Sequence, residues 1–207
     1  MVLELQNFEL NLRNIYLYDE IDNVSALGVL KAINEIVIKD KELFENNINL
    51  IKQIYKHGDF ESLNNKVNIP DINIYLNSVG GTCYSGFSLY DNIKNLNNTH
   101  CKTNIIASGC VMSMGVIILL SVPFEQRVCT KNTTFLIHQA SGFSIGKTAE
   151  MEEQLKETKR LTDRCFDIIS ENTDISKKTL KENYDKKEDW FLTADDALKL
   201  KLISQII

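Results

Sequence analysis

Residues 104–120, NIIASGCVMSMGVIILL, hold the pattern that decides the fold. Asn104–Ala107 is an apolar run typical of a buried strand, and Ser113–Leu120 predicts a helix with apolar residues on every side. A helix of that kind is buried in a protein core. The segment therefore predicts a strand, a turn and a core helix in close succession, and a serine stands at the turn.

Strands and helices alternate along the rest of the chain. The other expected strands are 14–18, 72–76, 127–129, 133–137, 190–192 and 202–207. The expected helices are 22–38, 84–96 and 148–172. Two more helices are expected after them: one that is capped by Asp174 and runs through Tyr184, and a short last helix opened by the capping pattern Thr193–Asp196. Residues 39–67 are rich in Lys, Asn and Glu and are interpreted as a solvated insertion with helical patches, such as Leu43–Tyr55. Alternation favours an α/β fold with mostly parallel strands.

Composition excludes several classes of protein. A length of 207 residues suits one domain, spanning 1–207. The net charge of −5 is spread along the chain without a basic stripe, so we expect no nucleic-acid partner. The longest apolar stretch, Val111–Phe124, is too short and interrupted to cross a bilayer. With no signal-like N-terminus, we expect a cytoplasmic protein without a membrane partner.

The five cysteines do not form a recognisable framework. Their number is odd, and no two of them stand at CxxC spacing. That pattern argues against a disulfide scaffold and against a zinc site. We interpret them as small apolar residues in a reducing compartment, and we expect neither a metal nor a cofactor.

Three segments carry side chains suited to nucleophilic catalysis. Ser113 opens the buried helix, where backbone N–H groups point past it in the way that stabilises an oxyanion, although a serine there is equally an ordinary N-cap. His138 follows the apolar strand ending at Ile137, and it is either a catalytic base or a hydrogen-bonded core histidine. Asp189 directly precedes another strand, and it either orients a histidine or is a solvated charge. The polar surroundings of His57 and His100 predict surface positions.

The order of these segments is more specific than any one of them. Gly80-Gly81 follows a strand in NSVGG, and then come MSMG around Ser113, IHQ around His138 and EDWF around Asp189. This succession resembles the Clp protease proteolytic subunit family, which shows NSPGG, ASMG, IHQP and an aspartate before an aromatic residue at similar separations. The resemblance covers about 14–207 and leaves 39–67 as an insertion.

The resemblance implies a serine endopeptidase with a spiral of βαβ units, the fold shared with crotonases. By position it implies Ser113 as nucleophile, His138 as base and Asp189 as the orienting carboxylate, with the N–H groups of Gly81 and Met114 as the oxyanion hole. It also implies a protruding handle over about 139–172, made of a strand at 141–149 and the helix 148–172. In the family, handles pair two stacked seven-membered rings into a tetradecamer, and an AAA+ ATPase feeds unfolded protein or peptides into the chamber.

Two alternatives stay open, the first of them because of several departures from the family pattern. Val111 and Met112 replace small residues before the serine, and Val79 and Ala140 replace prolines. Trp190 stands where many members carry an arginine used between rings. A catalytically silent ring subunit is therefore one alternative. A crotonase-type acyl-CoA enzyme is the other, although that chemistry needs no nucleophilic serine.

Overall fold

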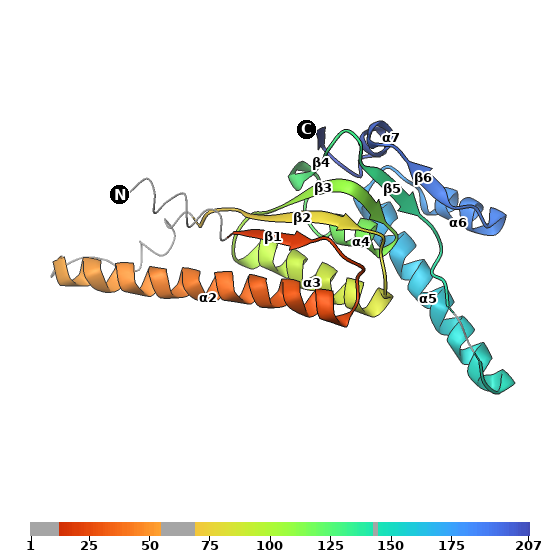
Figure 1. The fold of residues 1–207 in the computed structure, drawn as a ribbon, viewed down its shortest axis with the longest axis horizontal. Helices are drawn as coiled ribbons and strands as arrows, with labels where there is room; N and C mark the ends of the chain where they lie inside the picture. The colour runs from red at the N-terminus through yellow and green to blue at the C-terminus, as the bar shows by residue number, and fades with distance from the viewer. Residues whose placement is uncertain (1–12, 55–68, 143–144) are drawn as a thin grey trace.

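A computed structural model describes residues 13–54, 69–142 and 145–207 (Figure 1). Its strands are β1 (Asn14–Leu17), β2 (Ile72–Ser78), β3 (Thr103–Met112), β4 (Arg127–Cys129), β5 (Thr134–Ile137), β6 (Trp190–Leu192) and β7 (Gln205–Ile206). Its helices are α2 (Asn23–Ile54), α3 (Cys83–Thr99), α4 (Met114–Leu119), α5 (Thr148–Asn172), α6 (Lys177–Lys186) and α7 (Ala194–Lys199), with a 3-10 turn at Phe124–Gln126. No helix among these residues is long and apolar enough to cross a membrane.

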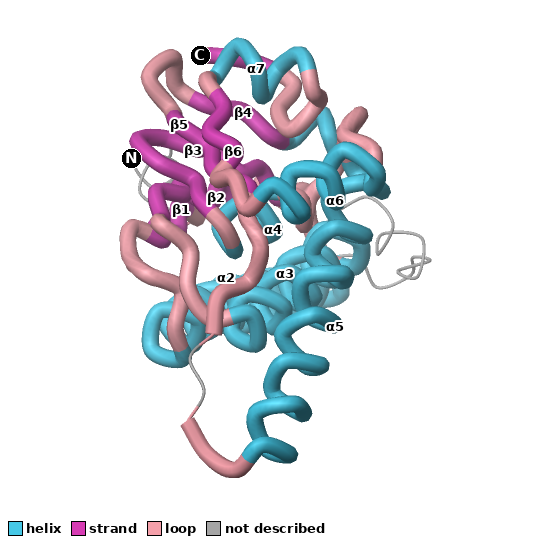
Figure 2. Tube along the Cα trace, turned by 90° about the vertical axis from the view of Figure 1, so that its right-hand side faces the viewer, coloured by secondary structure: helices cyan, strands magenta, loops and turns pink. Residues whose placement is uncertain are grey.

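One seven-stranded sheet organises the molecule. Its strand order is β1-β2-β3-β4-β7, and β5 pairs with both β3 and β6. Every pair is parallel except β5–β6, so the expected α/β fold with mostly parallel strands is confirmed. Figure 2 shows the strands apart from α2, α3 and α5, which lie together on one side of the sheet.

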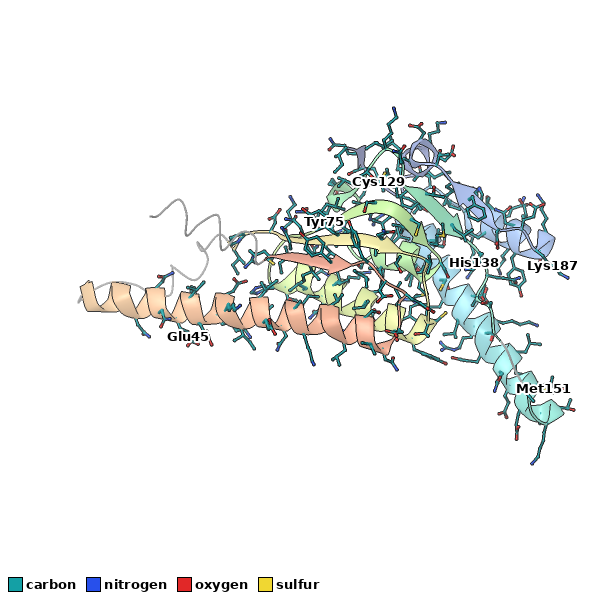
Figure 3. All side chains as sticks on the ribbon, viewed as in Figure 1. Glu45, Tyr75, Cys129, His138, Met151 and Lys187 are labelled. Carbon is teal, nitrogen blue, oxygen red and sulfur yellow. The ribbon has the colours of Figure 1, made fainter. Side chains whose placement is uncertain are left out.

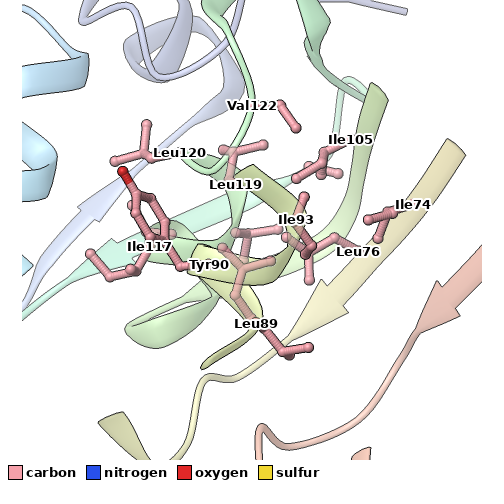
Figure 4. Close-up of a cluster of buried hydrophobic side chains, with 14 of the residues drawn as sticks. Ile74, Leu76, Leu89, Tyr90, Ile93, Ile105, Ile117, Leu119, Leu120 and Val122 are labelled. Carbon is pink, nitrogen blue, oxygen red and sulfur yellow. The ribbon is translucent and has the colours of Figure 1, made fainter. Parts of the chain in front are cut away.

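The core lies between the sheet and the helices α3 and α4. All six residues of α4 are buried, as their apolar sequence predicts. Alternate residues of β2 and β3 point toward them, which is the spacing that a strand gives to one face. Figure 4 shows this cluster, which includes Ile74, Leu76, Leu89, Ile93, Ile105, Ile117 and Leu119.

The first helix is much longer than expected. It does not end near Ile38 but continues to Ile54, so the residues read as an insertion are helical at least to that point, while 55–68 lie outside the described residues. No Gly or Pro interrupts 39–54. Lys and Glu have high helix propensity, and the lower propensity of Asn is not enough to end an exposed helix. A buried contact also holds this part: Asp40 binds Arg13 Nη1 at 2.6 Å and His100 Nε2 at 2.7 Å.

That contact corrects the expectation for one histidine. His100 is half-buried and paired with Asp40, rather than free at the surface. His57 lies outside the described residues.

A second correction concerns the start of α6. The helix begins after Ser176, whose hydroxyl accepts the Thr179 N–H, and the Asp174 carboxylate binds Lys201 instead of capping the helix. The Thr193–Asp196 capping box of the last helix is confirmed.

The helix α5 has the expected bounds but only half of the expected burial. Phe166 and Ile169 pack in the core, whereas Met151 and Leu155, expected on the same apolar side, are 44% and 55% exposed. Figure 3 labels Met151 near the tip of the half that projects from the body. The expected handle strand is not formed at 141–142 or 145–147, because no strand of the described sheet runs beside this segment to pair with it.

Candidate active site

The backbone turns sharply at Ser113, between β3 and α4. Its N–H donates to Leu136 O of β5 at 2.8 Å, and its φ is 53°, a value that non-glycine residues seldom adopt. Strained backbone of this kind is common at functional sites. Ser113 occupies the N-cap position of α4, but its hydroxyl makes no capping hydrogen bond. The ordinary N-cap interpretation therefore does not describe this serine.

The two glycines form the wall opposite this turn. A Cβ on Gly80 would lie 2.6 Å from Ser113 Cβ, 2.8 Å from Met112 O and 3.2 Å from Met114 N. A Cβ on Gly81 would lie 2.2 Å from Ile21 O. The φ angles of Gly80 and Gly81 are 99° and 150°, so both position and conformation require glycine.

A single backbone bridge fixes the direction of the Gly81 amide. Ile21 N–H donates to Gly80 O, and Thr82 N–H donates to Ile21 O, both at 2.7 Å. In a parallel bridge the central residue turns its own N–H away from its partner. The Gly81 N–H therefore points away from Ile21. The Met114 N–H, at the first position of α4, has no partner within its helix.

Two polar side chains that sequence reasoning did not assign hold this wall in place. Ser78 is buried, its hydroxyl donates to Asp19 O at 2.6 Å, and it accepts the Gly80 N–H at 3.2 Å. Asn77 Oδ1 accepts the Cys110 N–H at 3.1 Å, beside the bend that Gly109 makes in β3 with φ 62°. The only sequence signal for both roles is their place in NSVGG, directly before the glycines.

His138 and Asp189 meet because β5 and β6 are antiparallel. Ile137 at the end of β5 pairs with Trp190 at the start of β6, so the residues just beyond them are neighbours. His138 Nδ1 lies 3.6 Å from Asp189 Oδ1, longer than a hydrogen bond but within range of charge attraction. The His138 side chain is 28% exposed, so it is not a core histidine, and the Asp189 side chain is 60% exposed and largely solvated. Figure 3 shows His138 where the body meets α5.

One pocket joins Ser113 to His138. Its remaining lining is Cys83, Met114, Val116, Ile117, Ile137, Ala140, Cys165 and Ile169. The lining is largely apolar, which suits an uncharged side chain of a bound chain. A second pocket lies on the other side of His138, between Asp189 and α6. Within the described residues, no group of three or more His, Cys, Asp or Glu side chains is arranged to hold a metal ion.

The start of α3, next to the pocket residue Cys83, is tied to α5 by a polar contact. Tyr84, the second residue of α3, donates its hydroxyl to Glu157 Oε1 at 2.7 Å. Arg160 Nε donates to Glu157 Oε2 at 2.7 Å. The Arg160 and Tyr84 hydrogen bonds lower the pKa of Glu157 to about 2, so this carboxylate stays charged through the neutral range.

Comparison with known proteins identifies the family of this chain. The sequence model of the family described as Clp protease matches residues 49–207, most of the chain. The chain belongs to the Clp protease family. The match includes every candidate residue around Ser113 and His138, and it leaves out β1 and all of α2 before residue 49.

Curated members of the family align over a shorter part. The ATP-dependent Clp protease proteolytic subunit of Deinococcus radiodurans is 33% identical over 137 residues, which is 66% of this chain and 65% of that protein. The ATP-dependent Clp protease proteolytic subunit 3 of Rhizobium etli is 35% identical, again over 137 residues, covering 68% of its length. The corresponding subunit 3 of Rhizobium meliloti is 36% identical. The chain thus spans about two thirds of the length of the relatives it matches.

Proposed function

We propose that this chain is a serine-type endopeptidase subunit that hydrolyses peptide bonds of unfolded proteins or peptides. Ser113 is the nucleophile, His138 the general base and Asp189 the residue that orients the imidazole. The observation that carries the proposal is the Ser113 hydroxyl: it makes no bond to the helix it precedes, it stands on strained backbone, and it shares a pocket with His138.

In the proposed reaction, His138 Nε2 accepts the Ser113 proton while Oγ attacks the substrate carbonyl carbon. The tetrahedral intermediate collapses when the imidazolium protonates the leaving amine, and an acyl-enzyme remains. Water then attacks the ester with His138 again as base, which releases the new carboxylate and restores Ser113. The Asp189 charge favours the imidazolium that forms twice in this cycle.

The negative oxygen of the intermediate needs two amide donors. The N–H groups of Gly81 and Met114 are the proposed pair. The Gly81 N–H points away from the bridge to Ile21, and Met114 N lies beside the glycine turn. The loss of one such donor costs about 2.7–4 kcal/mol of transition-state stabilisation in a comparable enzyme.

Assembly is the second part of the proposal. We infer that 1–207 forms a single peptidase domain and that copies associate through the projecting half of α5 into stacked rings enclosing the sites. Met151 and Leu155 support this, because exposed apolar side chains on a projecting helix lose contact with water when a second copy covers them. An AAA+ ATPase is the proposed partner, since the relatives are named as subunits of an ATP-dependent protease.

A fluorophosphonate probe tests the nucleophile. We expect the probe to label wild-type protein on Ser113 and to leave Ser113→Ala unlabelled. Ser108→Ala is the matched control, because Ser108 is also a partly exposed serine, lies in the preceding strand β3 and pairs its hydroxyl with Tyr18. Labelling of Ser113→Ala at the wild-type rate would assign the reactive group elsewhere.

A catalytically silent ring subunit is the second candidate. The 3.6 Å separation of His138 and Asp189 favours it, because the imidazole then lacks a hydrogen bond that fixes its orientation. Hydrolysis of a fluorogenic peptide by the purified, assembled protein, lost in Ser113→Ala, would exclude this candidate. Assembly without any probe labelling would establish it.

A further inference from the structure

Two cysteines from different helices face the same pocket as Ser113 and His138. Cys83 is the first residue of α3, and Cys165 lies in the packed half of α5. Both are free thiols and both are partly exposed. Their neighbour in the pocket wall is Met114, whose Sδ accepts a hydrogen bond from the Cys165 thiol at 3.9 Å.

The environment of Cys83 favours its thiolate. The neighbouring Cys165 thiol, aided by the backbone N–H of Cys83 itself, lowers the pKa of the Cys83 thiol to about 7 against the opposing effect of burial. The proximity of Cys83 and burial raise the pKa of Cys165, so Cys165 stays protonated. Cys83 also stands at the N-terminus of a 17-residue helix, where a negative charge is favourable.

Other ionisable groups near the pair do not reverse this order. His138 reaches the pocket from the end of β5, and a proton on it would favour the Cys83 thiolate further. The charge of Arg164 on α5 lowers the pKa of Cys165, but it is the weakest of the effects on that pKa. On α3, the adjacent Tyr84 has a raised pKa because it donates to Glu157, so it remains neutral.

The remaining cysteines have different surroundings. Burial raises the pKa of Cys101 and of Cys129, and both are buried. Cys110 is partly exposed and its thiol donates to Asn77 Oδ1 at 3.4 Å. Cys110 is therefore the internal reference, because it is also partly exposed but has no thiol partner among the described residues.

We propose that Cys83, supported by Cys165, is a thiol-modification site in the wall of the substrate pocket, where a low-molecular-weight disulfide attaches and keeps substrate from Ser113. The blocking of substrate by the adduct rests on the proposed function. The modification of Cys83 rests only on the two cysteines in the pocket wall. The adduct occupies the apolar lining that would otherwise receive a substrate side chain.

The reaction is a thiol–disulfide exchange. The Cys83 thiolate attacks one sulfur of the reagent disulfide, the reagent S–S bond breaks, and the other half leaves as a thiolate that takes a proton from water. Cys83 is thereby oxidised to a mixed disulfide, while half of the reagent is reduced to a free thiol. A dithiol reductant reverses the step and restores the pocket.

Oxidised glutathione is the probe that tests the site. At pH 7 a thiol with a pKa of about 7 holds about 16 times more thiolate than one at 8.5, and its lower nucleophilicity takes back about fivefold, so we expect Cys83 to react about three times faster than an ordinary exposed thiol. The adduct is located by peptide mass mapping in full-length wild type, Cys83→Ser, Cys165→Ala and the control Cys110→Ser.

The pH profile separates a supported thiol from a merely accessible one. In wild type and Cys110→Ser, the rate at Cys83 should rise with a midpoint near pH 7. In Cys165→Ala the midpoint should move up toward that of an ordinary cysteine, about 8.5. A wild-type midpoint above 8, or the same midpoint without Cys165, would overturn the proposed pair, and the wild-type profile alone decides this should a variant fail to fold.

Probe labelling of Ser113 in the same samples tests the effect on the pocket. We expect the glutathione adduct on Cys83 to slow labelling at least tenfold, with recovery after reduction and no effect in Cys83→Ser. Unchanged labelling of the modified protein would overturn the blockade. Because mass mapping does not depend on Ser113, a reactive Cys83 beside a serine that never labels would refute the proposed function and leave the thiol site standing.

Discussion

The substitution Gly80→Ala tests the packing between the glycine turn and the nucleophile. The new Cβ would lie 2.6 Å from Ser113 Cβ and 2.8 Å from Met112 O. Both neighbours belong to the backbone turn between β3 and α4, so neither moves as a flexible side chain does. The residue would also have to keep φ near 99°, where alanine is strained.

The expected cost has two parts. A non-glycine residue held in a sparsely populated φ region costs about 1–3 kcal/mol. An extra carbon in a tightly packed site adds about 1–3 kcal/mol. The sum, about 2–6 kcal/mol, is a large share of the stability of a typical domain. Any relaxation that relieves the clash displaces Ser113 or the Met114 amide, so the reactivity of Ser113 should fall as well.

Urea unfolding and fluorophosphonate labelling measure the two effects in one set of samples. Gly28→Ala is the matched control, because Gly28 is exposed within α2 and nothing lies within 4 Å of its Cβ position. There the same change should stabilise by about 0.5–1 kcal/mol and leave labelling unchanged. Wild-type stability and labelling rate in Gly80→Ala would refute the close approach described for this turn.

Three further predictions follow from the geometry. His138→Ala should lower kcat for a peptide by about 10⁶, and Asp189→Ala by a smaller factor of about 10²–10⁴, because the imidazole remains and Asp189 is 60% exposed; equal losses in steady-state kinetics would contradict these roles. Asp40→Ala should destabilise the fold by about 3 kcal/mol in urea unfolding, because the side chains of Arg13 and Asp40 are only 8% and 11% exposed. The control Glu182→Ala removes an exposed pair with Lys178 and should cost less than about 1 kcal/mol. Equal losses of stability in the two variants would argue against the buried contact of Asp40. Leu155→Glu should reduce the assembled mass measured by light scattering, whereas Glu152→Gln on the same projecting half should not, and an unaltered assembly would remove this face from the interface.

Local pattern was enough to predict the elements that support the site. Apolar periodicity gave α5 its bounds, and the continuous apolar run gave α4 its burial. The end of α2 was mispredicted because Lys, Asn and Glu signal exposure to water, which both a loop and a solvated helix satisfy. Just beyond the expected end, Asp40 contacts Arg13 and His100, which lie 27 and 60 residues away, so no short window of sequence reveals this support.

The candidate site depends even more on distant contacts. The proximity of His138 and Asp189 follows from the antiparallel register of β5 and β6, which neither strand's sequence encodes alone. The facing of Cys83 and Cys165 likewise depends on how α3 and α5 pack. Residue order and motif resemblance selected segments that the structure brings together, but backbone strain at Ser113 and the 3.6 Å separation of His138 and Asp189 needed coordinates.

Through the bridge from Ile21, the N-terminal part of the chain contributes to the proposed oxyanion hole. The family match begins at residue 49, yet the backbone that aims the Gly81 amide belongs to a residue well before it. A hybrid chain joining residues 49–207 of this protein to the preceding part of a relative would inherit the serine from one parent and the orientation of its opposing amide from the other. Engineering of new specificities by such exchanges should therefore keep Ile21 and the glycine turn from the same parent.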